Sequence, residues 1–453
     1  MQSNRSKRKT AAPIDKRNTE ASVEAQAGNF PYETISGWSI ATALLGAAWL
    51  IDPFAEGGFD APKRLVALSA AVLAGVTLAW QVQWPDWRRW SRPALWILVL
   101  LALGCISLIV STFISPRQQQ AWPGLRTLML FGIFLPLGAA AFLGGPWGQR
   151  LLRIAILATA VNSVLSLAQA VGVKLPIGIA KLGGRLPTGA LLGNEGYVAL
   201  ACALMAAACL AVSLDTANSR QRLFALGCGA LGLIAIAVNQ QLTSAIAFSA
   251  AAITVAAVRW RVRWVVGLGT GIVLLAVVTA IVPPLRVFSW GALPVSSVED
   301  YQRLTTYRLG PWVAAVEMAA TRPFTGYGPG TFAAEVQTQR FAAEINLRTR
   351  LVPPVNANAY IFAHQDYLQL SAEAGIPTLI AFLAALGLLI AGLLKLTHGH
   401  RAQEPLILLA VLIAGAVAAL AWFPMQIPFT AIVLLLACGR AWRLIAEHDW
   451  RAA

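Results

Sequence analysis

The chain has 453 residues, of which 57% are hydrophobic and only 12% are charged, and its formal net charge is +15. Because a soluble domain carries roughly 25% charged residues, this composition excludes a soluble globular protein and indicates an integral membrane protein. All five cysteines lie inside apolar runs, where small core side chains are expected rather than zinc ligands or extracytoplasmic disulfides.

The chain begins with a polar, basic stretch and continues as a series of apolar segments. Residues 1–34 are predicted to be a disordered cytoplasmic tail, since no short apolar core with a cleavage site is present. A membrane helix needs ~20 mostly apolar residues. Twelve such segments lie near 35–51, 65–84, 93–114, 127–145, 151–171, 195–214, 223–239, 242–258, 264–283, 367–394, 405–423 and 428–444. We therefore predict an all-α, polytopic transmembrane helical bundle of about 12 spans.

The distribution of positive charge predicts the orientation of these spans. With the N-terminus inside, the inner segments hold 21 of the 35 lysines and arginines, and the short outer loops hold seven. The other seven lie in a loop at 284–363, which is too long to be included when positive charges are compared between the two sides of the membrane. Both termini, including the tail 445–453, are thus expected in the cytoplasm, with the long loop outside. The excess positive charge is a topology signal, with contact to anionic membrane lipids, and it does not predict nucleic-acid binding.

The predicted domains follow from this layout: spans one to nine over 35–283, a large periplasmic loop over 284–363, and spans ten to twelve over 364–444. The loop should contain short helices, one of them near 312–320 because Pro311 suits a first helical turn. This helix should break at "RPFTGYGPG", whose glycines and prolines demand turns. The motif lacks the ending of a phosphate-binding loop, so we expect a packed turn.

The candidate chemistry lies outside the spans. The apolar middles of the first nine and last two spans contain no ionisable residue, which disfavours an ion-driven transporter. His364 is the one histidine on the predicted outer side, where the long loop meets the tenth span. A lone histidine is more often structural than catalytic. Here Asp366 and Gln369 follow it within two helical turns, and arginines from other outer segments are available.

Four stretches resemble the O-antigen ligase and polymerase family of bacterial membrane glycosyltransferases. They are "RLPTGALLGNEGYVALAC", "NQQLTSAIAF", "YRLGPWVAAVEMAATRPFTGYGPGTF" and "HQDYLQLSAEAGIPTLIAF", in this order between about 185 and 382. The resemblance implies transfer or polymerisation of a lipid-diphosphate-linked glycan at the periplasmic face of the inner membrane. The donor would be an undecaprenyl-diphosphate-linked glycan and the acceptor a glycan or lipid, as in lipopolysaccharide or exopolysaccharide synthesis. No cofactor and no metal are implied.

The resemblance also implies roles for single residues. His364 matches the family's essential histidine, and an imidazole is suited to act as general base. Arg308 matches a loop arginine, and we expect it to bind the diphosphate, because guanidinium groups stabilise phosphate charge by bidentate contacts. Arg185 is a second candidate for the diphosphate, with an interfacial role as the alternative. Supporting positions are expected at Asp366, Gln365, Arg322 and Arg303. Asp366 would orient His364 or, preferably, cap its helix, whereas Glu373 and Gly375 look structural.

Two departures from the family pattern leave an alternative open. The arginine that relatives carry after the serine of "LTS" is Ala245 here, and of Asn-Pro-Asn only Asn194 remains. Either Arg185, Arg303 or Arg322 takes the place of this arginine, or the donor differs, or catalysis is impaired. The alternative function is a non-catalytic component that binds or exports a glycan lipid, and a transporter ranks third.

Overall fold

The computed structural model describes residues 30–52, 59–80, 87–173, 188–260, 308–351, 360–399 and 403–448. Every regular element in these ranges is helical. Nine of their helices are long and apolar enough to cross a membrane, and Gln403–Ala418 is a shorter apolar helix. The chain is therefore a polytopic helical membrane protein, as predicted.

The helices follow the predicted order along the chain. They are α2 (Phe30–Trp49), α3 (Ala61–Ala79), η1 (Trp87–Arg89), α4 (Arg92–Phe113), α5 (Gln118–Gly132), α6 (Phe134–Ala139), η2 (Ala141–Gly144), α7 (Pro146–Ala170), η3 (Ala190–Leu192), α8 (Glu195–Asp215), α9 (Ser219–Val238), α10 (Leu242–Trp260), α13 (Leu309–Thr321), α14 (Phe332–Leu347), α15 (Asp366–Ala374), α16 (Ile376–Gly399), α17 (Gln403–Ala418) and α18 (Pro428–Glu447). The predicted span 264–283 and most of the predicted tail 1–34 lie outside the described residues.

Two of the predicted spans differ from the observed helices. The span expected at 127–145 starts earlier and consists of α5 and α6, which meet at Ile133. The span expected at 367–394 is interrupted at Gly375, whose φ of +85° belongs to the left-handed region. This glycine ends α15, and α16 begins at the next residue. Hydropathy does not reveal either interruption, because it records the polarity of residues and not the conformation of the backbone.

The long-loop helix after Pro311 is confirmed. It is α13, and it ends at Thr321 before the "RPFTGYGPG" turns. Within those turns Gly326, Gly328 and Gly330 all have positive φ values. α14 follows directly and was not predicted.

The burial of the helices separates core from periphery. In the 18-residue apolar stretch of α8, 83% of the residues are buried, against 17% in the corresponding stretch of α4. α8 is rich in alanine, which lets α7, α9, α10 and α17 pack closely around it. The large apolar side chains exposed on α4 and other outer helices suit a hydrocarbon environment.

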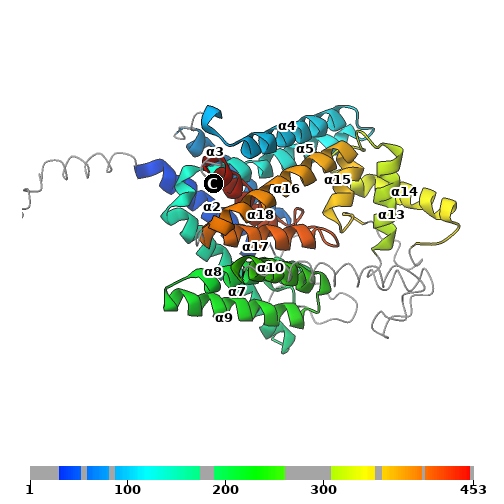
Figure 1. Cartoon of the computed structure of the whole chain (residues 1–453). Helices are drawn as coiled ribbons and strands as arrows, with labels where there is room; N and C mark the ends of the chain where they lie inside the picture. The colour runs from blue at the N-terminus through cyan, green and yellow to red at the C-terminus, as the bar shows by residue number, and fades with distance from the viewer. Residues whose placement is uncertain are drawn as a thin grey trace, which may run out of the picture.

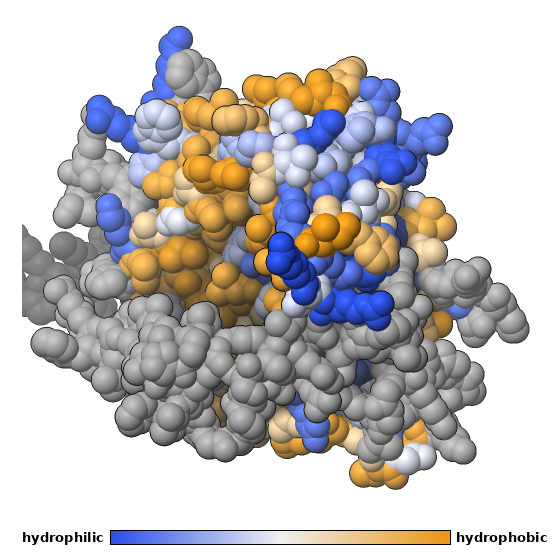
Figure 2. Space-filling model, turned by 90° about the vertical axis from the view of Figure 1, so that its right-hand side faces the viewer, coloured by the Kyte–Doolittle hydropathy of each residue, from blue (hydrophilic) through white to orange (hydrophobic). Residues whose placement is uncertain are grey.

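The elements of the long loop gather at one end of the bundle. In Figure 1, α13, α14 and α15 lie together at the right, and the C-terminus lies towards the opposite end. The loop helices share a small apolar core that includes Met318, Phe332 and Ala372. Figure 2 looks onto this end and shows hydrophilic residues beside apolar surface.

Candidate functional site

The candidate site is built on the loop between α17 and α18. Trp422 and Phe423 in this loop stack with ring centroids 5.0 Å apart. Phe362 stacks on Phe423 at 5.3 Å, and Tyr197 of α8 meets Phe423 edge-on at 5.8 Å. We call these four residues the aromatic platform. Such contacts fix the ring positions, because aromatic pairs prefer offset-stacked or edge-to-face geometries.

His364 lies on this platform. Its ring is 4.6 Å from Phe423 in an edge-to-face arrangement and 5.8 Å from Trp422. The φ of His364 is +56°, a left-handed conformation that is uncommon for a residue with a side chain. Strained backbone of this kind persists where the surrounding structure holds it, often at functional sites.

Arg308 reaches the same platform from the other side of the long loop. Its guanidinium carbon is 4.2 Å from the centroid of Trp422, and its Nη1 donates to the carbonyl of Ala421 at 3.3 Å. The residue immediately precedes α13, whose first turn contains Pro311. The fold thus brings the two residues singled out from the sequence, His364 and Arg308, to one pair of aromatic rings.

The environment keeps the His364 imidazole neutral. Burial, and then the charge of Arg308, lower the pKa of His364 to about 3. Its Nδ1 is buried and has no hydrogen-bond partner among the described residues. A neutral imidazole has a lone pair that can accept a proton, as a general base requires.

Gln365 and Asp366 have different roles from those expected. The helix cap of α15 is Gln365, whose side chain accepts a hydrogen bond from the Leu368 amide. The Asp366 carboxylate neither caps α15 nor bonds to His364. It accepts from the amide of Met425 at 2.8 Å, while its own amide donates to the Trp422 carbonyl. Asp366 therefore fixes the α17–α18 loop that carries the platform.

Asp366 also lies in a strongly desolvating environment, just before the span of α16. Burial raises the pKa of Asp366 to about 7, opposed by the hydrogen bond from Met425 and reinforced by Glu373. Its second oxygen, Oδ1, is buried without a partner among the described residues, as is Nε1 of Trp422. With Nδ1 of His364, three buried polar atoms of the platform and of the residues beside it have no partner among the described residues. Buried polar atoms are normally paired, so these three set the site apart from an ordinary packed core.

Two basic residues at the start of α3 were not singled out from the sequence. Arg64, at the start of α3, donates from Nη2 to the carbonyl of Gln426 at 3.0 Å. Lys63 is 2% exposed and donates to the carbonyl of Leu50 at 2.8 Å. The sequence showed them only as two outer-loop charges. Arg64 and Arg308 bind opposite ends of the α17–α18 loop, which no spacing in the chain reveals.

The two middle motifs also reach the platform. Asn194 caps α8 by accepting from the amide of Gly196 at 2.8 Å. A Cβ at Gly196 would lie 2.3 Å from the Trp422 ring, so only glycine permits this contact. In α10, Ala247 packs in the cluster of Trp422 and Phe423, and Ala245 packs against the neighbouring core cluster.

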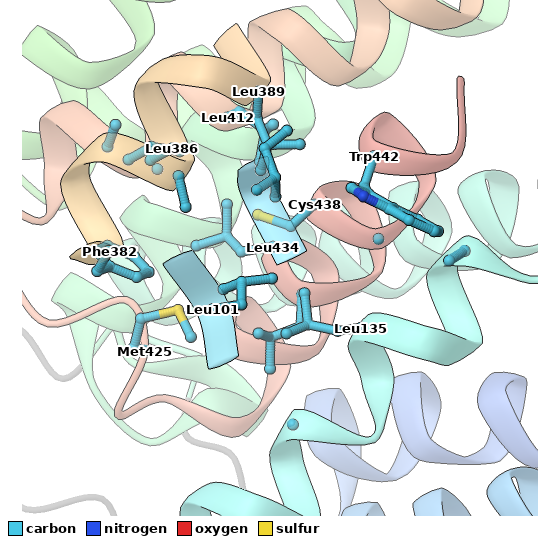
Figure 3. Close-up of a pocket in the computed structure, with 18 of the residues that line it drawn as sticks. Leu101, Leu135, Phe382, Leu386, Leu389, Leu412, Met425, Leu434, Cys438 and Trp442 are labelled. Carbon is cyan, nitrogen blue, oxygen red and sulfur yellow. The ribbon is translucent and has the colours of Figure 1, made fainter. Parts of the chain in front are cut away.

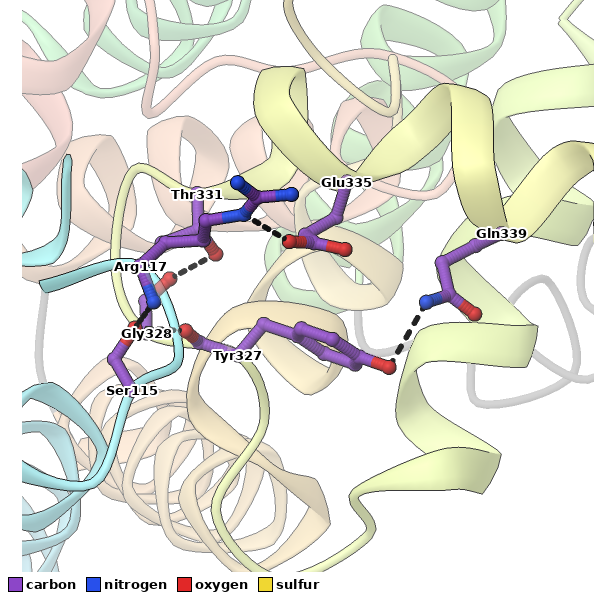
Figure 4. A network of polar contacts seen from close by, with 7 residues as sticks. All are labelled: Ser115, Arg117, Tyr327, Gly328, Thr331, Glu335 and Gln339. Carbon is purple, nitrogen blue, oxygen red and sulfur yellow. Dashed lines mark hydrogen bonds and ion pairs between the residues drawn. The ribbon is translucent and has the colours of Figure 1, made fainter.

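Of the remaining predicted arginines, Arg322 is among the described residues and lies away from the platform. Arg322 donates to the carbonyl of Ile114 at 3.4 Å and lies 5.1 Å from the Tyr327 ring. It belongs to the junction of α4, α5 and α14, which is tied by an ion pair of 2.6 Å between Arg117 and Glu335 and by the hydrogen bond of Gln339 to the Tyr327 hydroxyl (Figure 4). Arg185 and Arg303 lie outside the described residues.

The glycine-rich turn is packed, as expected, and does not present its amides to a ligand. The amide of Gly328 donates to the Glu373 carbonyl at 2.7 Å, and that of Gly326 to the Arg322 carbonyl at 2.9 Å. The Glu373 side chain accepts from the Phe332 amide at 3.1 Å, at the start of α14. Glu373 and Gly375 thus join the turn to the α15–α16 junction.

Within the described ranges, no group of three or more histidine, cysteine, aspartate or glutamate side chains is placed to hold a metal ion. Residues 227–383 match the family model described as O-antigen ligase. The matched segment runs from α9 into α16 and contains both His364 and Arg308. No curated protein matches the chain.

Proposed function

Through residues 227–383 the chain belongs to the O-antigen ligase and polymerase family, and on this premise we propose that it is a membrane glycosyltransferase of surface polysaccharide synthesis. It would transfer or polymerise a lipid-diphosphate-linked glycan at the membrane face that carries His364, the periplasmic face by the charge bias. The observation that carries the proposal is the meeting of His364 and Arg308 on one aromatic platform.

The proposed reaction joins an acceptor hydroxyl to the donor's anomeric carbon. His364 takes the hydroxyl proton as the new carbon–oxygen bond forms. The bond from the anomeric carbon to the lipid diphosphate breaks, and the diphosphate leaves with its electron pair. Arg308 stabilises the charge that develops on the leaving group, which is favourable because preorganised charge in a desolvated site costs no reorganisation.

A bound donor should change the pKa of His364. Burial is the larger cause of the low pKa of His364, and the charge of Arg308 is the second. A bound diphosphate would place negative charge against Arg308 and offset that repulsion. We therefore expect the donor to raise the pKa of His364, which makes the imidazole a better base.

Arg64 is our candidate for the second cation that relatives place at position 245. It lies at the opposite end of the α17–α18 loop from Arg308. Ala245 itself offers no charge, and this feature favours the alternative function, a non-catalytic glycan-lipid binding component.

One experiment separates the two functions. The purified protein in nanodiscs would be given a lipid-diphosphate-linked glycan and an acceptor, with transfer and donor binding measured separately. For an enzyme, His364→Ala should lower transfer by about 10²–10⁴-fold and leave donor binding in place. Arg322→Ala, a guanidinium outside the platform, is the matched control. Wild-type protein that binds donor but transfers nothing, together with unchanged donor binding in His364→Ala, would establish the binding component instead.

Polymerase and ligase are distinguished by the surface polysaccharide of cells lacking the gene. Loss of attachment to the acceptor, with long chains still made, identifies a ligase. Single repeat units on the acceptor identify a polymerase.

A further inference from the structure

Two cavities lie on different faces of α18 and share no lining residue. The larger one, between α4–α6 and α16–α18, is shown in Figure 3, where Leu434 and Trp442 of α18 point into it. The smaller one has a volume of about 300 Å³ and lies between α7, α8, α9, α17 and α18. Val433, Ala437 and Arg440 of α18 line this second space, which we call the basic cavity because of the charges described below.

The basic cavity lies at the end of the bundle opposite the aromatic platform. Its lining includes the first turns of α7, α9 and α17 and the last turn of α8. Since α8 begins beside the platform, where Gly196 contacts Trp422, its last turn lies at the opposite end. The charge bias of the sequence predicts that this end faces the cytoplasm. The basic cavity therefore belongs to a different membrane surface from the candidate site.

The interior of the basic cavity is apolar. Ile156 of α7, Ile407 and Val411 of α17, and Val433 of α18 form much of its wall. From Val433 to Arg440 the cavity follows two turns of α18, a distance of about 10 Å at ~1.5 Å per residue. Hydrocarbon fits such a wall, whereas a free anion would lose its hydration there without replacement.

Three charged residues line the basic cavity: Arg153, Glu404 and Arg440. Arg440 is neutralised by Glu404, because its Nε donates to one carboxylate oxygen at 2.7 Å and its Nη2 to the other at 3.1 Å. Arg153 forms no hydrogen bond or ion pair with any described residue. The lining thus carries one uncompensated positive charge, which an anion would balance.

Arg153 and Gln149 lie one turn apart on the same face of α7, and both line the basic cavity. Both side chains are exposed, and the Gln149 amide, like the Arg153 guanidinium, has no partner among the described residues. An arginine two turns inside a membrane helix is normally paired with an anion or extended towards the headgroup region. These two side chains therefore offer hydrogen-bond donors beside an apolar interior, an arrangement that suits a headgroup with an attached chain.

We propose that the basic cavity binds an anionic phospholipid of the cytoplasmic leaflet, with its phosphate at Gln149 and Arg153 and one acyl chain against α17 and α18. The apolar interior selects a lipid over a free anion, and the uncompensated charge selects an anionic headgroup over a zwitterionic one. Phe224, a lining residue that is 38% exposed, marks the side on which the cavity opens and leaves room for the second acyl chain. This site is separate from the platform and does not depend on the proposed transfer reaction.

The test uses the full-length protein in nanodiscs of phosphatidylglycerol and phosphatidylcholine. In each experiment one of the two lipids carries a diazirine midway along an acyl chain, and crosslinked peptides are mapped by mass spectrometry. Phosphatidylglycerol should label the cavity residues of α17 and α18 about fivefold more than phosphatidylcholine, the effect of one basic group on an anionic lipid. The middle of α4, which is mostly exposed, provides the internal standard, because both lipids should label it equally.

Arg153→Gln should remove the preference for phosphatidylglycerol, and Arg153→Lys should retain it. Arg150→Gln is the matched control, since Arg150 is an exposed guanidinium on α7 outside the cavity lining. Substitutions at such exposed positions rarely disturb folding. A preference that persists in Arg153→Gln, equal labelling by the two lipids in the wild type, or labels that miss the cavity would each overturn the proposal. Neither donor nor acceptor glycan is present, so the result stands or falls separately from the enzymatic function.

Discussion

At the scale of single residues, the platform explains why polar groups lie at the edge of an apolar run. His364, Asp366 and Glu373 each have a defined position there, but they do different work. Glu373 joins the glycine-rich turn to α15, and Asp366 holds the α17–α18 loop. His364 places its imidazole ring against Trp422, which Arg308 also touches. Hydrogen bonds offset the cost of burying Glu373, whereas Oδ1 of Asp366 and Nδ1 of His364 have no partner among the described residues.

Arg64 provides a prediction at this scale. If it supplies the second cation, Arg64→Ala should raise the KM for the lipid-diphosphate donor by about tenfold, the loss of one charge-assisted hydrogen bond. Steady-state transfer assays in nanodiscs would measure it. Arg126→Ala, which removes an exposed guanidinium on α5, is the control. An unchanged KM in Arg64→Ala would show that Arg64 does not replace the arginine that relatives carry at position 245.

At the scale of elements, the break between α15 and α16 is the feature that positions the site. Gly375 has a φ of +85°, and a Cβ there would lie 2.5 Å from the backbone of Phe324. The break turns α15 away from the axis of α16 and allows the amide of Ile376 to donate to the Pro323 carbonyl at 2.7 Å. A continuous helix would carry His364 away from the loop it now contacts.

Gly375→Ala should therefore destabilise the protein by about 1–3 kcal/mol and lower transfer activity with it. Thermal unfolding in detergent and a transfer assay would measure the two effects. Gly387→Ala is the matched control, since its Cβ meets nothing within 4 Å and alanine is the better helix former by up to ~1 kcal/mol. Equal melting temperatures for the two variants would contradict a structural need for glycine at 375.

The buried Glu373 predicts a pH dependence of stability. Burial raises the pKa of Glu373 from 4.5 to about 7, against opposing hydrogen bonds from Gly330, Phe332 and Gln369. Between these two values the folded state keeps a proton that the unfolded state has lost. The stability from the neutral carboxyl is thus fully present below about pH 4.5 and is lost as the pH rises through 7.

Glu373→Gln isolates this contribution, because it keeps a carbonyl oxygen for the Phe332 amide and cannot ionise. The melting temperature of the wild type relative to Glu373→Gln should fall between pH 5 and pH 8. His364 titrates in both proteins, so its contribution cancels in the comparison, whereas Glu373→Gln also removes the charge that raises the pKa of Asp366. A constant difference across this range would show that Glu373 keeps the same charge when folded and unfolded.

At the scale of the whole molecule, burial and charge describe a protein arranged for a bilayer. The alanine-rich α8 lies inside, the large apolar side chains of α4 face outwards, and the loop helices gather at one end (Figure 1). The charge bias predicts that this end faces the periplasm, with the C-terminus on the cytoplasmic side.

Cysteine labelling in intact cells would test this orientation. Thr338→Cys, at an exposed position of α14, should react with a membrane-impermeant maleimide. His448→Cys, after the end of α18, should react only once the cells are permeabilised. The reverse pattern would place the candidate site in the cytoplasm and end the proposal of periplasmic transfer.

The sequence by itself determined the helical membrane class, most of the helices and the long-loop helix after Pro311, and it singled out His364 and Arg308, whose roles stay predictions. It could do so because a bilayer requires each apolar segment to pair its own backbone groups. Motif residues can also be recognised from a short stretch of sequence. Only the tertiary structure decided the breaks at Ile133 and Gly375, the use of Gln365 as a cap, and the meeting of Arg64, Arg308 and His364 around the α17–α18 loop. These features arise from contacts between segments far apart in the chain. Hydropathy is calculated for each segment separately, so it does not predict which segments will be in contact.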